Sequence, residues 1–132
     1  MIEIPFGQFM DGNYEEGGRG YELYIVKHSM DILYVGRSRQ NIWDRWFGDF
    51  GRMRQYADGS WYFRDSISRE IIDNMPKSLC WMIELWTRED CAKFFADKIK
   101  TLDFFADSCD ITDYEPWMIQ ELHPKFNCTY NT

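Results

Sequence analysis

Two short β-rich runs, separated by four residues, constrain the fold of this chain more than any other feature. The runs are YELYIV, which starts at residue 21, and DILYV, which starts at residue 31. Their β-branched and aromatic residues, so close together in the chain, predict an antiparallel hairpin. If residues 27 and 31 close the pair, Tyr24 lies directly opposite Tyr34 and the two phenols share one face of the sheet.

Apolar spacing along the rest of the chain predicts helices around one further strand. A helix capped by Ser38 or Asn41 follows the hairpin, with an apolar stripe made of Ile42, Trp43, Trp46, Phe47, Phe50 and Met53. The other expected elements are a short helix near 64–75, a buried strand at 78–86, a long helix at 89–107, and a last helix at 114–122 that Pro124 stops. This order predicts an α+β fold with a small three-stranded antiparallel sheet flanked by helices.

The first twenty residues show little periodicity. Residues 7–20, GQFMDGNYEEGGRG, hold five glycines, which is typical of a loop. We therefore expect an N-terminal loop or arm over residues 1–20 and one domain over residues 21–132. A chain of 132 residues that is 45% hydrophobic carries enough apolar surface for a single core.

The expected compartment is the cytoplasm. Apolar runs fall short of the ~18 residues that a membrane helix needs, and the start MIEIPFGQFMDG lacks the charged and apolar segments of a signal peptide. We therefore expect a cytoplasmic protein without a membrane partner. The cysteines lack the C-x-x-C spacing of zinc sites, so we expect buried, reduced thiols at Cys80, Cys91, Cys109 and Cys128.

Charge is distributed unevenly along the chain. The net charge is −7, yet residues 37–69 contain seven arginines against four aspartates, a local charge of +3. A local basic patch attracts anions even on an acidic protein, and arginine offers forked hydrogen bonds to phosphate or carboxylate. The alternative interpretation is ordinary ion pairing of these arginines with the neighbouring aspartates.

Four separated elements of the sequence resemble the GIY-YIG nuclease family. In Glu115–Asn127 (EPWMIQELHPKFN), the glutamate is followed by an apolar residue, a proline and an asparagine at the family's intervals of four, nine and twelve positions. The match covers most of the expected domain and implies a GIY-YIG-like fold that hydrolyses DNA phosphodiester bonds. The other three elements are Tyr24-Ile25-Val26, Tyr34-Val35-Gly36 ten positions later, and Arg45 in the following helix.

The same resemblance implies a role for each motif residue. Tyr34 is similar to the family's general base, and Tyr24 to a residue that steers the water or holds the phosphate. Arg45 corresponds to the forked donor on the scissile phosphate, and Asn127 to the asparagine that helps shape the site. Glu115 resembles the single carboxylate that holds one Mg²⁺ ion, which keeps several waters and takes phosphate oxygen as a further ligand. A phenol is a weak base at neutral pH, so the role of Tyr34 requires nearby positive charge.

DNA is therefore the expected partner, and the arginines are the candidates for its backbone. Arg37, Arg39, Arg52 and Arg54 are the predicted nucleic-acid-binding residues. Arg37 and Arg39 leave the strand end beside Tyr34, where we expect them to contact phosphates next to the scissile one. The sequence contains no zinc finger or helix-turn-helix signature, so a homodimer or a protein partner could supply target selectivity.

Each motif residue also has a structural interpretation. Glu115 could form a capping box with Thr112, and Arg45 could pair with Asp49 on the surface of the helix for ~0.3 kcal/mol. The two tyrosines are ordinary strand residues, and asparagine near a proline is common in loops. The joint pattern carries the nuclease interpretation.

The chain departs from the family pattern in two places. Glu22 and Leu23 stand where glycine and isoleucine are usual. Asp49 stands one helical turn after Arg45, where the family commonly has a histidine or tyrosine as a further acid or base. Tyr56 or His28 are the candidates to replace that group.

Three functions are consistent with the sequence. The first is a Mg²⁺-dependent endonuclease that cleaves DNA. The second is a nucleic-acid-binding module on the same fold that has lost cleavage, with Asp49 neutralising Arg45. The third is an interaction protein whose acidic surface engages another protein, for example as a mimic of DNA.

Overall fold

The computed structural model describes residues 1–12, 20–48, 53, 66–102 and 108–127. The described elements are β1 (Ile2–Pro5), α1 (Phe6–Met10), β2 (Tyr21–His28), β3 (Asp31–Arg37), α2 (Ile42–Phe47), α4 (Ser66–Asp73), the 3₁₀ helix η1 (Lys77–Cys80), β4 (Met82–Thr87), α5 (Arg88–Phe94), α6 (Ala96–Leu102) and α7 (Ile111–Leu122). The predicted α+β class is confirmed. In this part of the chain, no helix is both long and apolar enough to cross a membrane.

The sheet has four antiparallel strands in the order β1-β4-β2-β3, and not the three that were expected. The additional strand is β1, which pairs with β4 from Ile2↔Leu85 to Pro5↔Met82. Helix α1 follows at once and buries Phe6 and Phe9. The prediction of an N-terminal loop or arm is therefore wrong for residues 2–10, where a short apolar alternation forms a strand by pairing with a distant partner.

The hairpin of β2 and β3 is confirmed, but its predicted register is wrong. Tyr24 pairs with Gly36, and Tyr34 pairs with Val26. The next couple is Lys27 with Ile32, so Leu33 is an extra residue in β3, a β-bulge that shifts the pairing. The predicted facing of Tyr24 and Tyr34 thus becomes a diagonal contact on the same face.

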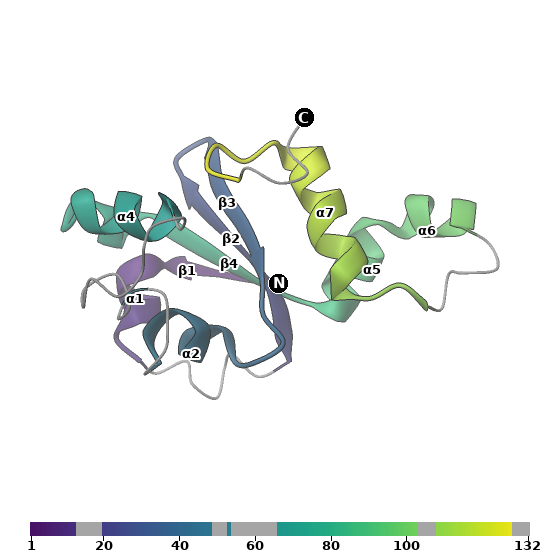
Figure 1. Cartoon of the computed structure of the whole chain (residues 1–132), viewed down its shortest axis with the longest axis horizontal. Helices are drawn as coiled ribbons and strands as arrows, with labels where there is room; N and C mark the ends of the chain where they lie inside the picture. The colour runs from purple at the N-terminus through teal and green to yellow at the C-terminus, as the bar shows by residue number, and fades with distance from the viewer. Residues whose placement is uncertain (13–19, 49–52, 54–65, 103–107, 128–132) are drawn as a thin grey trace.

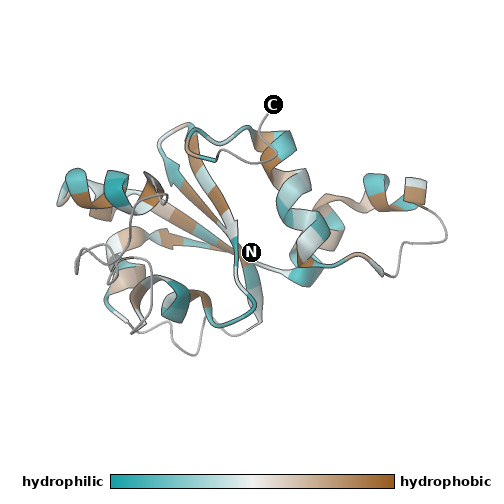
Figure 2. Cartoon of the chain, viewed as in Figure 1, coloured by the Kyte–Doolittle hydropathy of each residue, from teal (hydrophilic) through white to brown (hydrophobic). Residues whose placement is uncertain are grey.

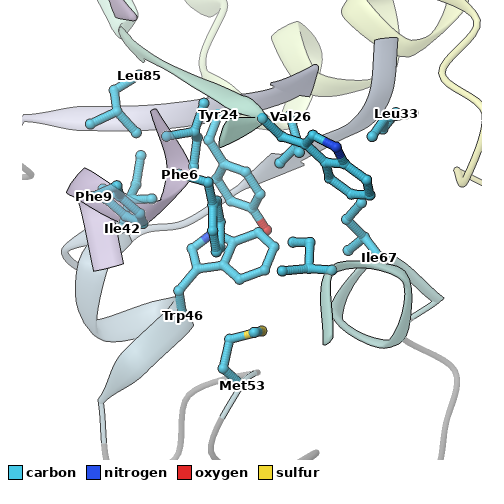
Figure 3. Packing of buried hydrophobic residues seen from close by; sticks show 13 residues of the cluster. Phe6, Phe9, Tyr24, Val26, Leu33, Ile42, Trp46, Met53, Ile67 and Leu85 are labelled. Carbon is cyan, nitrogen blue, oxygen red and sulfur yellow. The ribbon is translucent and has the colours of Figure 1, made fainter. Parts of the chain in front are cut away.

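Helices cover both faces of the sheet (Figure 1). On one face, α1, α2 and α4 pack over Tyr24 and Val26, and Figure 3 shows the aromatic core that they enclose. On the other face, α5 and α7 pack over Leu23 and Ile25. In Figure 2 the hydrophobic colour concentrates on the strands, and hydrophilic colour marks outer turns of helices such as α4. Two cores therefore share one sheet.

An ion-pair group, here called the Lys27 cluster, ties three strands together near the hairpin turn. Lys27 Nζ lies 2.7 Å from Glu3 and 2.5 Å from Glu84, which is 7% exposed. Trp86 Nε1 also donates to Glu84 at 2.8 Å. The hydrogen bond from Lys27 lowers the pKa of Glu3. For Lys27, burial acts to lower the pKa, but the hydrogen bonds and charges of Glu3 and Glu84 outweigh burial, so the pKa of Lys27 is raised. The cluster fixes β1 to β4 and β2.

Several predicted elements have different bounds. The strand expected at 78–86 starts only at Met82, because η1 precedes it and the Ser78 hydroxyl donates to Ile71 O at 2.6 Å. The long helix expected at 89–107 is divided at Phe95 into α5 and α6, and residues 103–107 lie outside the described part. Residues 57–60 and Phe50 also lie outside it.

The cysteines only partly match the expectation. Cys80, Cys91 and Cys109 are free thiols, as predicted, but only Cys91 is buried, and its burial raises its pKa to about 12. Cys80 is exposed, Cys109 is intermediate, and Cys128 lies outside the described residues.

Candidate active site

The two tyrosines form a stacked pair on the face that α2 covers. Their ring centroids are 6.2 Å apart with an interplanar angle of 26°. The Tyr24 ring lies against Gly36, where a Cβ would approach its Cζ and hydroxyl atoms to 2.3 Å. Only glycine leaves room for this ring, so the glycine of the Tyr34-Val35-Gly36 motif sets the position of Tyr24. Tyr24 in turn supports Tyr34.

The two phenols differ in exposure. Tyr24 is 0% exposed and meets Trp46 edge to face, with the centroids 5.5 Å apart. Figure 3 shows its ring enclosed by core side chains, including Phe6. Tyr34 is partly exposed at the border of the same core. Of the two phenols, Tyr34 is the one that solvent can reach, and the buried Tyr24 ring supports it from the core side.

Asn127 holds the outer edge of β3 beside this pair. Its amide oxygen accepts from Val35 N at 2.9 Å, and its amide nitrogen donates to Val35 O at 2.8 Å. The preceding residues Lys125 and Phe126 donate their backbone N–H groups to Ile32 and Leu33. Asn127 therefore pairs with β3 as a strand would and fixes the segment that carries Tyr34.

Three arginines gather where β3 ends and α2 begins. The chain turns through Ser38, whose N–H donates to Glu22 O at 2.9 Å, and Asn41 caps α2 by accepting from Asp44 N at 3.3 Å. The resulting open pocket of about 510 Å³, called here the arginine pocket, is lined by Arg37, Ser38, Arg39, Gln40 and Arg45. Sequence reasoning missed Ser38 and Gln40 as lining residues, although they alternate with the arginines in the run RSRQ.

Glu115 approaches the arginine pocket from the other face of the sheet. It lies on α7, which packs against β3, and its Oε1 is 3.7 Å from Arg37 Nε. The capping box of α7 is formed by Asp110 and Asp113, and not by Thr112 with Glu115. The alternative interpretation of Glu115 as a capping residue is therefore wrong.

The donor chemistry of Glu115 fits the Mg²⁺ ion that the resemblance implies. Mg²⁺ in phosphoryl-transfer sites is held by one or two carboxylates together with waters and substrate phosphate. Glu115 offers one carboxylate with a side chain that is 17% exposed, so it is accessible yet constrained. The neighbouring Arg37 side chain is 42% exposed and has room to turn away.

A smaller pocket of about 220 Å³ lies on the other side of Arg39. The positive charge of Arg88 in this pocket is neutralised by Glu22, to which Arg88 donates two hydrogen bonds of 3.0 Å. Hydrogen bonds from Thr112, and then the charge of Arg39, lower the pKa of Asp110 in this pocket. Arg39 therefore stands between an open basic pocket and a neutralised one.

The remaining predicted residues fall into two groups, those outside the described part of the chain and His28. Arg52, Arg54, Asp49 and Tyr56 lie outside the described residues. His28 pairs with Asp31 at the turn of the hairpin and stacks on Trp81, with the ring centroids 5.2 Å apart. Arg37 is at the opposite end of the hairpin, roughly 16 Å along the strands. His28 therefore lies away from the arginine pocket.

Comparisons of this chain with family models, curated proteins and solved structures found no match. Among the described residues, the arginine pocket and Glu115 meet at the end of β3, and Tyr34 lies three residues earlier on the same strand.

Proposed function

We propose that this protein is a Mg²⁺-dependent endonuclease that hydrolyses DNA phosphodiester bonds through a GIY-YIG-type site. The observation that carries the proposal is the end of β3, where three arginines line an open pocket and the Glu115 carboxylate reaches one of them. This arrangement offers both a binding site for an anion and a carboxylate for a metal. A partly exposed tyrosine on the same strand adds a group that can exchange a proton.

The residues divide the chemistry of hydrolysis among them. Arg45 neutralises the charge that the phosphate gains when water attacks, since a guanidinium matches two phosphate oxygens. The Tyr34 hydroxyl relays the proton of the attacking water. Tyr24, with Gly36 beneath it, keeps the Tyr34 ring in place. The Mg²⁺ ion, held by Glu115, would supply Lewis-acid stabilisation of the phosphate and leaving oxygen.

Positive charge near Tyr34 is a requirement of this assignment. A phenol transfers a proton efficiently at neutral pH only if cations stabilise the phenolate. In this proposal that charge would come from the metal and from Arg45, which lies in the last turn of α2 and lines the arginine pocket.

A second candidate function is a DNA-binding module that does not cleave. The observation in its favour is the contact between Arg37 and Glu115, which occupies the proposed metal ligand with a cation of the chain itself. An acidic mimic of DNA is less consistent with the structure, because an open pocket of arginines attracts anions.

A nicking assay on supercoiled plasmid tests the proposal, with Glu115→Gln as the decisive variant. The neutral amide cannot hold a hard, hydrated cation, so Mg²⁺-dependent nicking should be lost. The matched control is Glu121→Gln, which makes the same change at an exposed position of the same helix and should nick normally.

Stability and binding complete the test. Glu115→Gln should melt within a few degrees of wild type, since Glu115 takes no part in the capping box, and should still bind DNA without metal. If wild type fails to nick any DNA form with Mg²⁺ and still binds duplex, the binding module replaces the nuclease.

A further inference from the structure

Arg37 belongs to two environments at once. It lines the arginine pocket together with Arg39 and Arg45, and its Nε lies 3.7 Å from Glu115 Oε1. The first environment favours an anion, and the second is itself an anion of the chain. One guanidinium therefore stands between the proposed phosphate site and the proposed metal ligand.

The contact between Arg37 and Glu115 is loose. Charge-assisted hydrogen bonds between nitrogen and carboxylate oxygen are about 2.7–2.9 Å long, well short of the 3.7 Å found here. Arg37 is also 42% exposed, so its side chain can reorient at small cost. A phosphate in the arginine pocket can offer Arg37 two oxygens in the geometry that a guanidinium prefers, and so competes well for it.

A divalent cation and Arg37 compete for the same carboxylate. Both are positive, and Glu115 is the carboxylate that each would use. A cation that arrives while Arg37 is beside Glu115 meets like-charge repulsion and must displace the guanidinium. If Arg37 moved to a phosphate of bound DNA, its positive charge would no longer repel a cation at Glu115.

We propose that Arg37 exchanges partners, leaving Glu115 for a phosphate of bound DNA, and that this exchange couples DNA binding to Mg²⁺ binding. The inference rests on the proposed function and assigns Arg37 a positioning role. Without DNA, Arg37 keeps cations off Glu115. With DNA, the carboxylate becomes available where the phosphate lies, so that the metal binds mainly in the presence of substrate.

Mn²⁺ titration of the DNA-free protein, followed by calorimetry and by electron paramagnetic resonance of free Mn²⁺, tests the exchange. Arg37→Gln removes the competing charge and should bind Mn²⁺ about tenfold more tightly than wild type, within the usual range of coupling between sites. The matched control is Arg39→Gln, which removes one positive charge from the same pocket. It should change Mn²⁺ affinity by no more than about twofold, since Arg39 is not the arginine paired with Glu115.

A conservative variant and a second readout guard against trivial explanations. Arg37→Lys keeps the cation near Glu115 and should stay near wild type in Mn²⁺ affinity. Ca²⁺ should tighten the binding of a short duplex to wild type and Arg39→Gln by a larger factor than to Arg37→Gln, because coupling between two ligands is reciprocal. Circular dichroism verifies that each variant is folded.

The outcomes separate the inference from the function. If wild type nicks DNA with Mg²⁺ but the Gln variants at 37 and 39 bind Mn²⁺ alike, the exchange is overturned and the nuclease stands. If neither wild type nor Arg37→Gln binds Mn²⁺, with or without duplex, and no nicking occurs, both are overturned. Tighter binding confined to Arg37→Gln supports the exchange.

Discussion

The Lys27 cluster and the arginine pocket lie at opposite ends of the same hairpin. They differ in how closely their charged groups are paired. In the Lys27 cluster, one lysine meets two carboxylates at 2.7 and 2.5 Å. In the arginine pocket, which three arginines line, only Arg37 is seen to contact a described carboxylate, that of Glu115 at 3.7 Å. Among the described residues, Arg39 and Arg45 form no ion pair.

This difference separates charge used for structure from charge available for binding. A buried ion such as Glu84 requires close partners, because an unpaired buried charge is costly. Guanidinium groups at a hydrated pocket do not require close partners, and their N–H groups remain available to donate hydrogen bonds to a ligand. A charged residue in the sequence can therefore serve structure or binding, and only its contacts in the folded protein distinguish the two roles.

The largest expected effect on stability is at the Lys27 cluster. Lys27→Met should lower the free energy of unfolding by about 3 kcal/mol, because it leaves Glu84 buried without its cation. Chemical denaturation measures the loss, and Lys77→Met is the control at an exposed position, with an expected change within about 0.5 kcal/mol. A loss for Lys27→Met no larger than for Lys77→Met would break the comparison.

The effect should depend on pH. A lowered pKa at Glu3 stabilises the fold above about 4.5, and this contribution is lost as the pH falls below that value. A raised pKa at Lys27 stabilises the fold below about 10.5, and this contribution is lost as the pH rises above it. The deficit of Lys27→Met should therefore be greatest between these limits.

The second-largest expected effect is on the rate of cleavage, at Tyr34. Tyr34→Phe keeps the ring that stacks on Tyr24 but removes the hydroxyl, so cleavage should fall by about 100-fold, or ~2.7 kcal/mol of barrier. Its melting temperature should hardly move. Single-turnover cleavage measures the effect, and Tyr24→Phe should reduce cleavage less. Near-normal cleavage by Tyr34→Phe would remove the phenol from the mechanism.

The smallest expected effect is on affinity at the arginine pocket. Changing Arg37 and Arg39 together to Ala should weaken duplex binding and reduce the slope of log K against log salt by about 2, one for each lost phosphate contact. At saturating Mg²⁺ and DNA, single-turnover cleavage should change little, because Arg45 remains. Binding measured across a salt series tests this, and an unchanged slope would count against the pocket as a phosphate site.

Local patterns predicted the hairpin and most helices, and long-range pairing accounts for the errors. The Asn41 cap, the strand runs and the stop of α7 before Pro124 are signals within a few residues of where they act. Strand β1 depends on β4, about eighty residues away, and the bulge at Leu33 is defined only by its partner strand. The alternation in β1 is too short to outweigh the glycines that follow it, and the bulge has no signature within its own strand.

The sequence nominated candidate site residues but did not indicate how they would be arranged in space. The resemblance to the GIY-YIG family nominated Tyr34, Arg45 and Glu115, but it did not indicate that the carboxylate approaches from the opposite face of the sheet to the tyrosines. It also did not predict that Arg37 would be the arginine beside Glu115, because that contact depends on how α7 packs on β3. The pairing of Asn127 with both backbone groups of Val35 likewise requires the folded edge.

The contacts of residues 125–127 with β3 also bear on self-association. An outer strand with bare N–H and C=O groups is a template on which a second molecule can add a strand and start an aggregate. Here Lys125, Phe126 and Asn127 occupy those groups along Ile32, Leu33 and Val35. Truncating the chain before Lys125 would expose this edge, so the truncated protein should self-associate through β3, the strand that carries Tyr34.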